Sequence, residues 1–182
     1  MPGLRIVVAD DSVLFREGLV RLIEDAGHVV VAAVGDAVAL RTAVVEHEPD
    51  LAIVDVRMPP GDGDDGALAA VELRSAQPGT GVLLLSQHVE LRHCLPLLGE
   101  PGFGYLLKES VLHLDDFDRA LRRVAGGGVA LDPVVVQALV RGQSAPAVAG
   151  LSVREGEVLA LVAQGLSNAR IADQLRVSDR TV

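Results

Sequence analysis

Five side chains that could do chemistry together stand at the ends of short apolar runs. They are Asp10 and Asp11 after the first run, Asp55 after the third, Ser86 at the end of the fourth, and Lys108 at the end of the fifth. Carboxylates brought close together repel one another, so a cation is expected between them. Oxygen ligands with access to water suit Mg²⁺. A hydroxyl and an ammonium facing such a site would complete a receptor for a phosphoryl group.

The elements that carry these residues alternate between two kinds. Short apolar runs, typical of strands buried on both faces, occupy 4–9, 28–34, 51–54, 81–85 and 103–107. Amphipathic segments, typical of helices, occupy 13–25, 36–47, 67–77 and 115–125. Ser12 is the expected N-cap of the first helix, whose apolar stripe includes Leu14. Pro96 lies inside 89–99, so we expect a short or irregular helix there.

This alternation predicts an α/β fold. We expect a doubly wound, flavodoxin-like sheet of five parallel strands in the order 2-1-3-4-5, with helices on both faces. In that order the first and third strands are neighbours at the switch point, where ligands bind in such sheets. The three aspartates would then converge on one crevice.

Composition excludes several classes of protein. The chain has 182 residues, and 49% of them are hydrophobic, so global disorder is excluded. No apolar run approaches the roughly 18 residues that cross a bilayer, and the early pair Asp10-Asp11 argues against a signal peptide. The single cysteine excludes an internal disulfide, and a 2% aromatic content argues against a stacking platform for single-stranded nucleic acid. These features predict a soluble cytoplasmic protein with no membrane partner.

Four motifs resemble the receiver domain of bacterial two-component response regulators. They are Ala9-Asp-Asp-Ser12, Val54-Asp-Val-Arg-Met-Pro59, Leu85-Ser86 and Gly104-Tyr-Leu-Leu-Lys-Glu109. The resemblance covers about residues 3–126 and implies the following roles. Asp55 would be the phosphoacceptor, Asp10, Asp11, Asp55 and the Arg57 backbone carbonyl would hold Mg²⁺, and Ser86, Tyr105 and Lys108 would be the switch hydroxyl, the switch aromatic and the phosphate contact. Phosphorylation would draw Ser86 toward the phosphoryl group and let Tyr105 turn inward.

The sequence also departs from the receiver pattern. The loop 58–66 is a few residues longer than usual and carries three aspartates, but they do not match a calcium loop. His88, two residues after Ser86, stands where the family tunes dephosphorylation. The histidines have no metal-ligand spacing, and we expect them to have packing or surface roles.

The segment 151–182 resembles a LuxR-type helix-turn-helix. Ser152 and Glu155 fit a capping box at its start. The resemblance implies DNA contacts from Ser178, Arg180 and Thr181, yet the sequence stops within the recognition helix. Four arginines balance four acidic residues here, so phosphate attraction is weak. We expect this shortened motif to bind DNA poorly, and a cut chain explains the abrupt stop better than a natural end does.

The predicted organisation is therefore a receiver domain over 1–126, a linker over 127–150 with a further helix at 131–141, and a partial all-α helix-turn-helix over 151–182. The predicted function is that of a homodimeric transcription factor, phosphorylated on an aspartate by a sensor histidine kinase to control binding to promoter DNA. Its only catalysis would be self-phosphorylation and slow autodephosphorylation.

Two other functions stay open. One is an interaction or dimerisation module without DNA output, which the shortened tail favours. The other is a phosphohydrolase with an aspartate nucleophile. Such an enzyme needs a general acid two residues after the nucleophile, and that position holds Arg57, which cannot serve.

Overall fold

The computed structural model describes residues 3–61, 64–90, 92, 95–97 and 99–142. The chain divides into two compact units, Met1–Ala130 and Leu131–Val182. The segment 151–182, with the expected DNA-contacting residues Ser178, Arg180 and Thr181, lies outside the described residues, so its helices stay predictions.

The strands form a single sheet in the order β2-β1-β3-β4-β5-β6. Their bounds are Arg5–Ala9 for β1, Val29–Val34 for β2, Leu51–Asp55 for β3, Gly81–Ser86 for β4, Phe103–Leu107 for β5 and Ala130–Leu131 for β6. The pairs β1–β2, β1–β3, β3–β4 and β4–β5 are parallel, which confirms the expected order of the first five strands. The expected number of five is wrong, because β6 adds a sixth strand beside β5. A strand of two residues is too short to leave an alternating pattern in the sequence.

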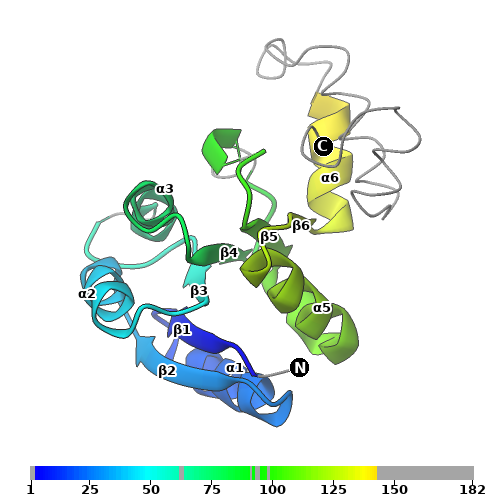
Figure 1. The fold of residues 1–182 in the computed structure, drawn as a ribbon. Coiled ribbons are helices and arrows are strands. Elements are labelled where there is room, and N and C mark those ends of the chain that lie inside the picture. Colours follow the sequence, from blue (N-terminus) through cyan, green and yellow to red (C-terminus); the bar gives the residue numbers. More distant parts are fainter. Residues whose placement is uncertain (1–2, 62–63, 91, 93–94, 98, 143–182) are drawn as a thin grey trace. The chain divides into compact units, whose positions relative to one another are not determined.

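The helices α1, α2, α3 and α5 cover the two faces of the sheet, with α1 and α5 on one side and α2 and α3 on the other (Figure 1). Their bounds are Val13–Asp25 for α1, Ala37–His47 for α2, Asp65–Ala76 for α3 and Leu114–Ala125 for α5. Two 3₁₀ turns, η1 (Leu95–Leu97) and η2 (Lys108–Leu112), flank β5, and α6 spans Pro133–Gly142. Among the described helices, none is both long enough and apolar enough to cross a membrane.

The core on the α1 and α5 side is built from alternate residues of the central strands. Ile6 and Val8 of β1 pack there with Ile53 of β3, Leu83 of β4 and Leu121 of α5, and all are at most 1% exposed. Every residue of β3, β4 and β5 is buried, which explains why these strands are continuous apolar runs in the sequence. Full burial of one such aliphatic side chain contributes about 1.5–3 kcal/mol, so the central strands are the most firmly held part of the fold.

The start of α1 differs from the expectation in two respects. Ser12 occupies the N-cap position, but its side chain makes no capping hydrogen bond. Leu14, assigned to the apolar stripe, is 86% exposed. Its neighbour Phe15 packs against the core instead, because Phe15 lies four and eight residues before Leu19 and Ile23 and so shares their buried face of the helix.

In its described part, the segment between β4 and β5 contains the helical residue Arg92 and a 3₁₀ turn over Leu95–Leu97. Pro96 is the central residue of this turn, and Gly99 follows with a φ of +88°. A proline lacks the amide hydrogen that a continuing helix needs, which fits the short, irregular element expected from the sequence.

A buried histidine ties the start of the sheet to α5. The His28 side chain is fully buried, and its Nδ1 accepts a hydrogen bond of 2.9 Å from the Leu4 amide. Nε2 must therefore carry the proton, which it donates to Asp118 Oδ1 at 2.7 Å. The other oxygen of Asp118 accepts a hydrogen bond from Arg122 at 3.0 Å. Desolvation would raise the pKa of Asp118, but the bonds from Arg122 and His28 outweigh it and lower that pKa.

We predict that Asp118→Asn lowers the free energy of unfolding by about 1 kcal/mol at pH 7, because the asparagine keeps the shape but loses the charge that these two bonds use. A carboxyl with a lowered folded-state pKa contributes stability that is present above its usual value of 3.8 and is lost as the pH falls through the folded pKa. The difference in the free energy of unfolding between the variant and the unsubstituted chain should therefore shrink below pH 4. Urea unfolding at several pH values measures it.

The control for this prediction is Asp116→Asn. Asp116 pairs with Arg119 on the exposed side of the same helix, where both side chains are about 70% exposed (69% and 71%). We expect a change within about 0.5 kcal/mol there. Equal losses in both variants would show that the bond to His28 adds nothing to stability.

Candidate functional site

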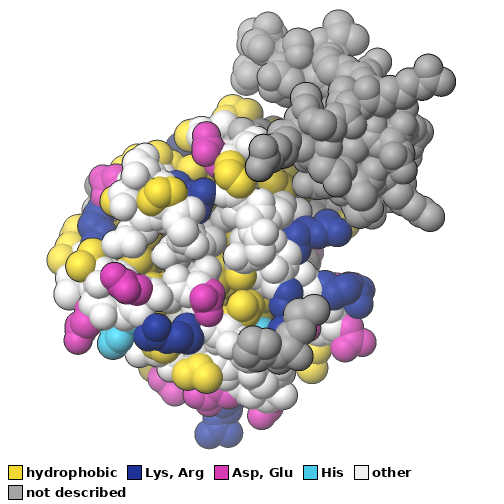
Figure 2. Space-filling model, viewed as in Figure 1, with side chains coloured by type: hydrophobic (Ala, Val, Ile, Leu, Met, Phe, Trp, Pro, Cys, Tyr) yellow, Lys and Arg dark blue, Asp and Glu magenta, His cyan; other side chains and the backbone are white. Residues whose placement is uncertain are grey.

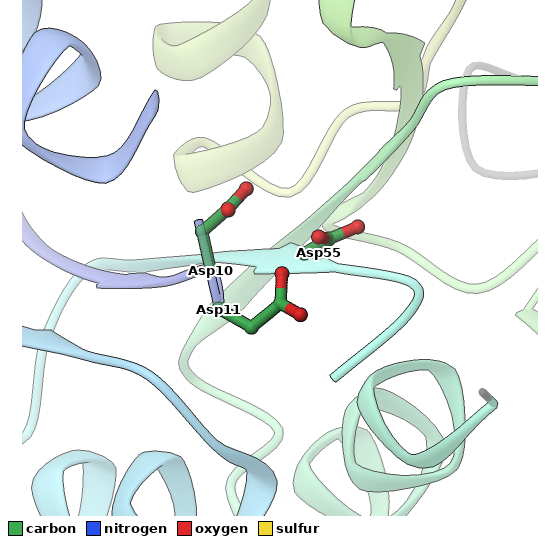
Figure 3. A group of neighbouring side chains, drawn as sticks. All are labelled: Asp10, Asp11 and Asp55. Atoms are coloured by element: carbon green, nitrogen blue, oxygen red, sulfur yellow. The ribbon is translucent and has the colours of Figure 1, made fainter. Parts of the chain in front are cut away.

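Three carboxylates meet at the C-terminal edge of the sheet. Asp10 and Asp11 directly follow β1, and Asp55 ends β3, which lies beside β1 (Figure 3). Each carboxylate offers one oxygen, and these oxygens lie within 4.8 Å of one another. Asp10 is 1% exposed and Asp55 is 5% exposed, whereas Asp11 is exposed. The juxtaposition expected from the sequence is thus present, with two buried members and one that faces solvent.

Lys108 holds the two buried carboxylates. Its Nζ donates a hydrogen bond of 2.7 Å to Asp55 Oδ2 and lies 2.7 Å from Asp10 Oδ2. The ammonium is not aligned for a hydrogen bond to Asp10 Oδ2, so that buried oxygen has no hydrogen-bond donor among the described residues. The contact with Asp10 is an ion pair.

The Lys108 ammonium also faces an aromatic ring. Nζ lies 4.7 Å from the centre of the Phe15 ring, close enough for a cation–π interaction. Two carboxylates and one ring face therefore surround this single cation. Phe15 was missing from the sequence-based site because nothing in the spacing of α1 shows which apolar residue faces the end of β5.

Burial and the neighbouring charges shift the pKa values of Asp55 and Lys108. Desolvation raises the pKa of Asp55 and the nearby charge of Asp10 adds to the increase, although Lys108 opposes both. Burial alone would lower the pKa of Lys108, but its interactions with Asp10 and Asp55 outweigh that effect and raise the pKa. Lysine is therefore a fixed cation here, and the ionised form of Asp55 is less stable than an exposed carboxylate would be.

Gly66 lets α3 begin directly against the end of β3. A Cβ atom at this position would lie 1.9 Å from the backbone oxygen of Asp55, which no side chain can tolerate. The Arg57 amide donates to Asp55 Oδ1 at 3.2 Å, and the Val56 amide donates to the Leu85 carbonyl at 2.9 Å. The Arg57 amide therefore orients the Asp55 side chain, and the bond from Val56 to Leu85 holds the backbone that follows it.

Ser86 and Tyr105 lie on the strands next to Asp55. Ser86 Oγ accepts a hydrogen bond of 3.3 Å from the His88 amide. The Tyr105 side chain is fully buried, and its hydroxyl donates to the His88 carbonyl and accepts from the Glu90 amide, both at 3.2 Å. Tyr105 is thus already turned inward in this structure, because its hydroxyl finds backbone partners in the segment after β4.

Together these residues surround a cavity of about 280 Å³. It is lined by Asp11, Ser12, Asp55, Arg57, Ser86, Gln87, His88, Glu90 and Lys108. Five of the seven expected receiver residues contribute, and Asp10 and Tyr105 are not part of the lining. The volume is sufficient for a phosphoryl group with its water shell.

The donor set fits Mg²⁺. Three carboxylates supply hard oxygen ligands, and the unsatisfied Asp10 Oδ2 is a buried atom that a cation would complete. The exposed position of Asp11 gives the water access that Mg²⁺ retains when bound. The backbone carbonyl of Arg57, the further ligand implied by the resemblance, belongs to a residue that lines the same cavity.

Comparison with known proteins assigns each of the two parts of the chain to the family that its motifs resemble. Residues 6–117 match the response regulator receiver domain, and residues 149–182 match the bacterial regulatory proteins of the luxR family. This chain belongs to the LuxR-type response regulators. It is thus a response regulator transcription factor, as the motifs predicted.

Two curated relatives of this response regulator match along almost its whole length. A probable transcriptional regulatory protein NarL of Mycobacterium tuberculosis is 39% identical over 183 residues, covering 98% of this chain and 82% of the relative. The oxygen regulatory protein NreC of Staphylococcus carnosus is 32% identical over 190 residues, covering 98% and 86%.

Solved structures resemble this response regulator as well. The signal receiver domain of the M. tuberculosis NarL is 36% identical, with a TM-score of 0.60, and covers 70% of this chain and 99% of that one. A structure described as two RcsB dimers bound to two parallel DNAs is 25% identical, with a TM-score of 0.63, and covers 98% and 86%.

Sequence reasoning missed two parts of the receiver site. One is Phe15, described above. The other is the ion pair of Arg57 with Glu90, in which Arg57 Nη2 lies 2.7 Å from Glu90 Oε1 at the cavity lining. Glu90 stands outside the receiver motifs, and only the path of the chain after β4 places it opposite Arg57.

We predict that Mg²⁺ raises the melting temperature of the chain and that Asp55→Asn raises it without Mg²⁺. Desolvation, the main cause of the raised pKa of Asp55, and the nearby charge of Asp10 both destabilise the ionised carboxylate, and each change offsets this cost. For the variant we expect a gain of about 1 kcal/mol and a weaker response to Mg²⁺. Thermal unfolding with Mg²⁺ or EDTA measures both effects.

The matched control is Asp25→Asn, at the exposed end of α1 away from the three carboxylates. Its Mg²⁺ response should equal that of the unsubstituted chain. A full Mg²⁺ response in Asp55→Asn would remove Asp55 from the metal site.

Proposed function

We propose that this response regulator is switched by phosphorylation of Asp55, with Mg²⁺ held by Asp10, Asp11, Asp55 and the Arg57 carbonyl. The donor would be a sensor histidine kinase, and the output would be binding of a homodimer to promoter DNA in the cytoplasm. The observation that carries the proposal is the Lys108 ammonium, 2.7 Å from oxygens of both Asp10 and Asp55 inside a cavity large enough for a phosphoryl group.

The chemistry follows from these contacts. A carboxylate oxygen of Asp55 attacks the phosphorus of the donor, a new P–O bond forms, and the bond to the donor breaks with its electron pair leaving on the donor. Lys108 neutralises phosphoryl oxygens because it is a fixed cation within reach of Asp55. Bound Mg²⁺ would supply further charge neutralisation on those oxygens.

The response to phosphorylation would pass through Ser86. Its Oγ accepts from the His88 amide, and its own proton is available to a phosphoryl oxygen. Tyr105 is inward already, so we propose that phosphorylation stabilises this arrangement rather than creating it. The bonds of the Tyr105 hydroxyl to His88 and Glu90 would carry the change to the segment after β4.

The domain organisation that we propose has a receiver over 1–126, a linker over 127–150 and DNA-contacting residues Ser178, Arg180 and Thr181 in the luxR-family segment. Figure 2 shows Lys and Arg scattered among Asp and Glu on the described face, with no basic stripe along it. This distribution favours DNA contact by the luxR-family segment over contact by this face of the receiver.

The alternative functions have less support. A phosphohydrolase would need an acid two residues after Asp55, but Arg57 is a permanent cation and its guanidinium is bound to Glu90. An interaction module without DNA output has no specific observation in its favour among the described residues.

We predict that acetyl phosphate with Mg²⁺ adds the mass of one phosphoryl group to the chain and that Asp55→Asn removes this addition completely. EDTA should also prevent it, because the donor oxygens would lose the charge that balances them. Intact-mass spectrometry measures the product, with Asp25→Asn as a control that keeps full labelling. Labelling of Asp55→Asn to the same level would falsify the phosphoacceptor assignment.

A separate prediction concerns Ser86→Ala. The variant should still take up phosphate on Asp55 but should show a weaker change in self-association when beryllofluoride and Mg²⁺ are added. The lost hydroxyl removes one charge-assisted hydrogen bond of about 1.5–3 kcal/mol from the phosphorylated form. Sedimentation velocity of both chains with and without beryllofluoride measures the effect. An unchanged response would exclude Ser86 as the sensor.

A further inference from the structure

We propose that Phe15 is a positioning residue for phosphoryl transfer, because its ring holds the Lys108 ammonium at the place where that cation meets Asp55 and the incoming phosphoryl group. This inference rests on the proposed phosphorylation of Asp55. Phe15 is not among the residues that line the Asp55 cavity, so it acts through Lys108 and not on the reacting atoms.

The contacts of the Lys108 ammonium leave part of its orientation open. Nζ lies 2.7 Å from an oxygen of Asp55 and 2.7 Å from an oxygen of Asp10, but only the contact with Asp55 is aligned as a hydrogen bond. An ammonium has three N–H donors, so one aligned bond does not fix the other two. The Phe15 ring, centred 4.7 Å from Nζ, attracts the same cation.

A ring suits this position better than another carboxylate would. The face of an aromatic ring carries partial negative charge but no net charge. A further carboxylate would add to the repulsion between Asp10 and Asp55 and would compete with phosphoryl oxygens for the ammonium. The attraction to a ring face also has no fixed hydrogen-bond direction. Phe15 therefore holds Lys108 in place without occupying its N–H donors.

The ring itself is held by α1. Phe15 is half-buried and packs against the core on the same helix face as Leu19 and Ile23, which are 2% and 0% exposed. The guanidinium of the next residue, Arg16, donates a hydrogen bond to the backbone carbonyl of Asp10, which ties the first turn of α1 to the end of β1. The position of the ring is thus set by the helix and does not depend on Lys108.

This arrangement has a consequence for the transfer step. An oxygen of Asp55 forms a bond to phosphorus, the bond to the donor breaks, and its electron pair leaves with the donor. Because the carboxylate loses its charge in this step, Lys108 must turn its hydrogen bond toward a phosphoryl oxygen. A cation held by the ring can turn without leaving its place. Without the ring, the flexible lysine stem lets the ammonium withdraw toward water, and transfer is slower.

The test is the rate of phosphorylation by acetyl phosphate at saturating Mg²⁺, followed by intact-mass spectrometry. Phe15→Leu keeps an apolar side chain but removes the ring, and we expect it to slow phosphorylation about threefold to tenfold.

A second series separates attraction by the ring from packing. Phe15 is replaced by mono-, di- and trifluorophenylalanine, in which each fluorine weakens the negative potential of the ring face with little change in its shape. We expect the rate to fall stepwise along this series, by about twofold to fivefold for the trifluoro ring. A role in packing alone would not give this graded response.

The matched control is Phe117 of α5. It belongs to the same core cluster and is 4% exposed, and no cation lies over its ring among the described residues. Fluorination of Phe117 should leave the rate unchanged.

Three results would overturn the positioning role. They are an unchanged rate in Phe15→Leu, a faster rate in that variant, and equal rates for all the fluorinated rings at Phe15. A faster rate would show that the ring holds Lys108 away from the phosphoryl group.

Failure of the proposed function has a different signature. If the unsubstituted chain takes no phosphate, the phosphorylation assignment is wrong, and the hold of Phe15 on Lys108 is then tested by nuclear magnetic resonance of the unphosphorylated chain. The ring current of Phe15 should shift the ε-methylene protons of Lys108 upfield, because the end of this side chain lies over the ring. Phe15→Leu should return them to the position of an ordinary lysine. Equal shifts in the two chains would reject the positioning role in that case as well.

Discussion

Two carboxylates buried side by side are tolerated in this fold because one lysine lies between them. Asp10 and Asp55 are almost fully buried, and Lys108 Nζ is 2.7 Å from an oxygen of each. Without that cation, both carboxylates would lose their hydration and gain only each other's repulsion. The three residues come from the ends of β1, β3 and β5, so the balance of charge depends on the order of the strands.

Lys108 only partly neutralises the two buried carboxylates. This partial neutralisation suits a site that binds a metal ion and a phosphoryl group. Asp10 Oδ2 has a cation nearby but no aligned hydrogen bond, and Asp55 keeps a raised pKa in spite of Lys108. A site with fully satisfied carboxylates would gain little from a second cation. Here an additional positive charge relieves the repulsion between the carboxylates of Asp10 and Asp55. A phosphoryl group adds oxygens that Lys108 can contact.

The segment after β4 connects this charge balance to the rest of the domain. Its backbone is bonded to Ser86 Oγ at one residue and to the Tyr105 hydroxyl at two, and its Glu90 side chain reaches Arg57 beside Asp55. A change in charge at Asp55 is therefore linked to residues 87–90 through these polar bonds.

The sequence by itself determined the α/β class, the order of the first five strands and the family, because fully buried parallel strands leave continuous apolar runs and their polar ends fall at fixed places. It also placed Asp10, Asp11, Asp55, Ser86 and Lys108 at one edge of the sheet, since parallel strands share that edge. Only the tertiary structure decided that Phe15 rather than Leu14 packs inward, that a two-residue β6 joins the sheet, and that Glu90 meets Arg57. Phe15 lies at helical spacing from Leu19 and Ile23, but the order of the residues does not show that its ring meets Lys108. The other two features depend on pairing by backbone alone and on the path of an irregular segment, and neither leaves a periodic pattern in the order of the residues.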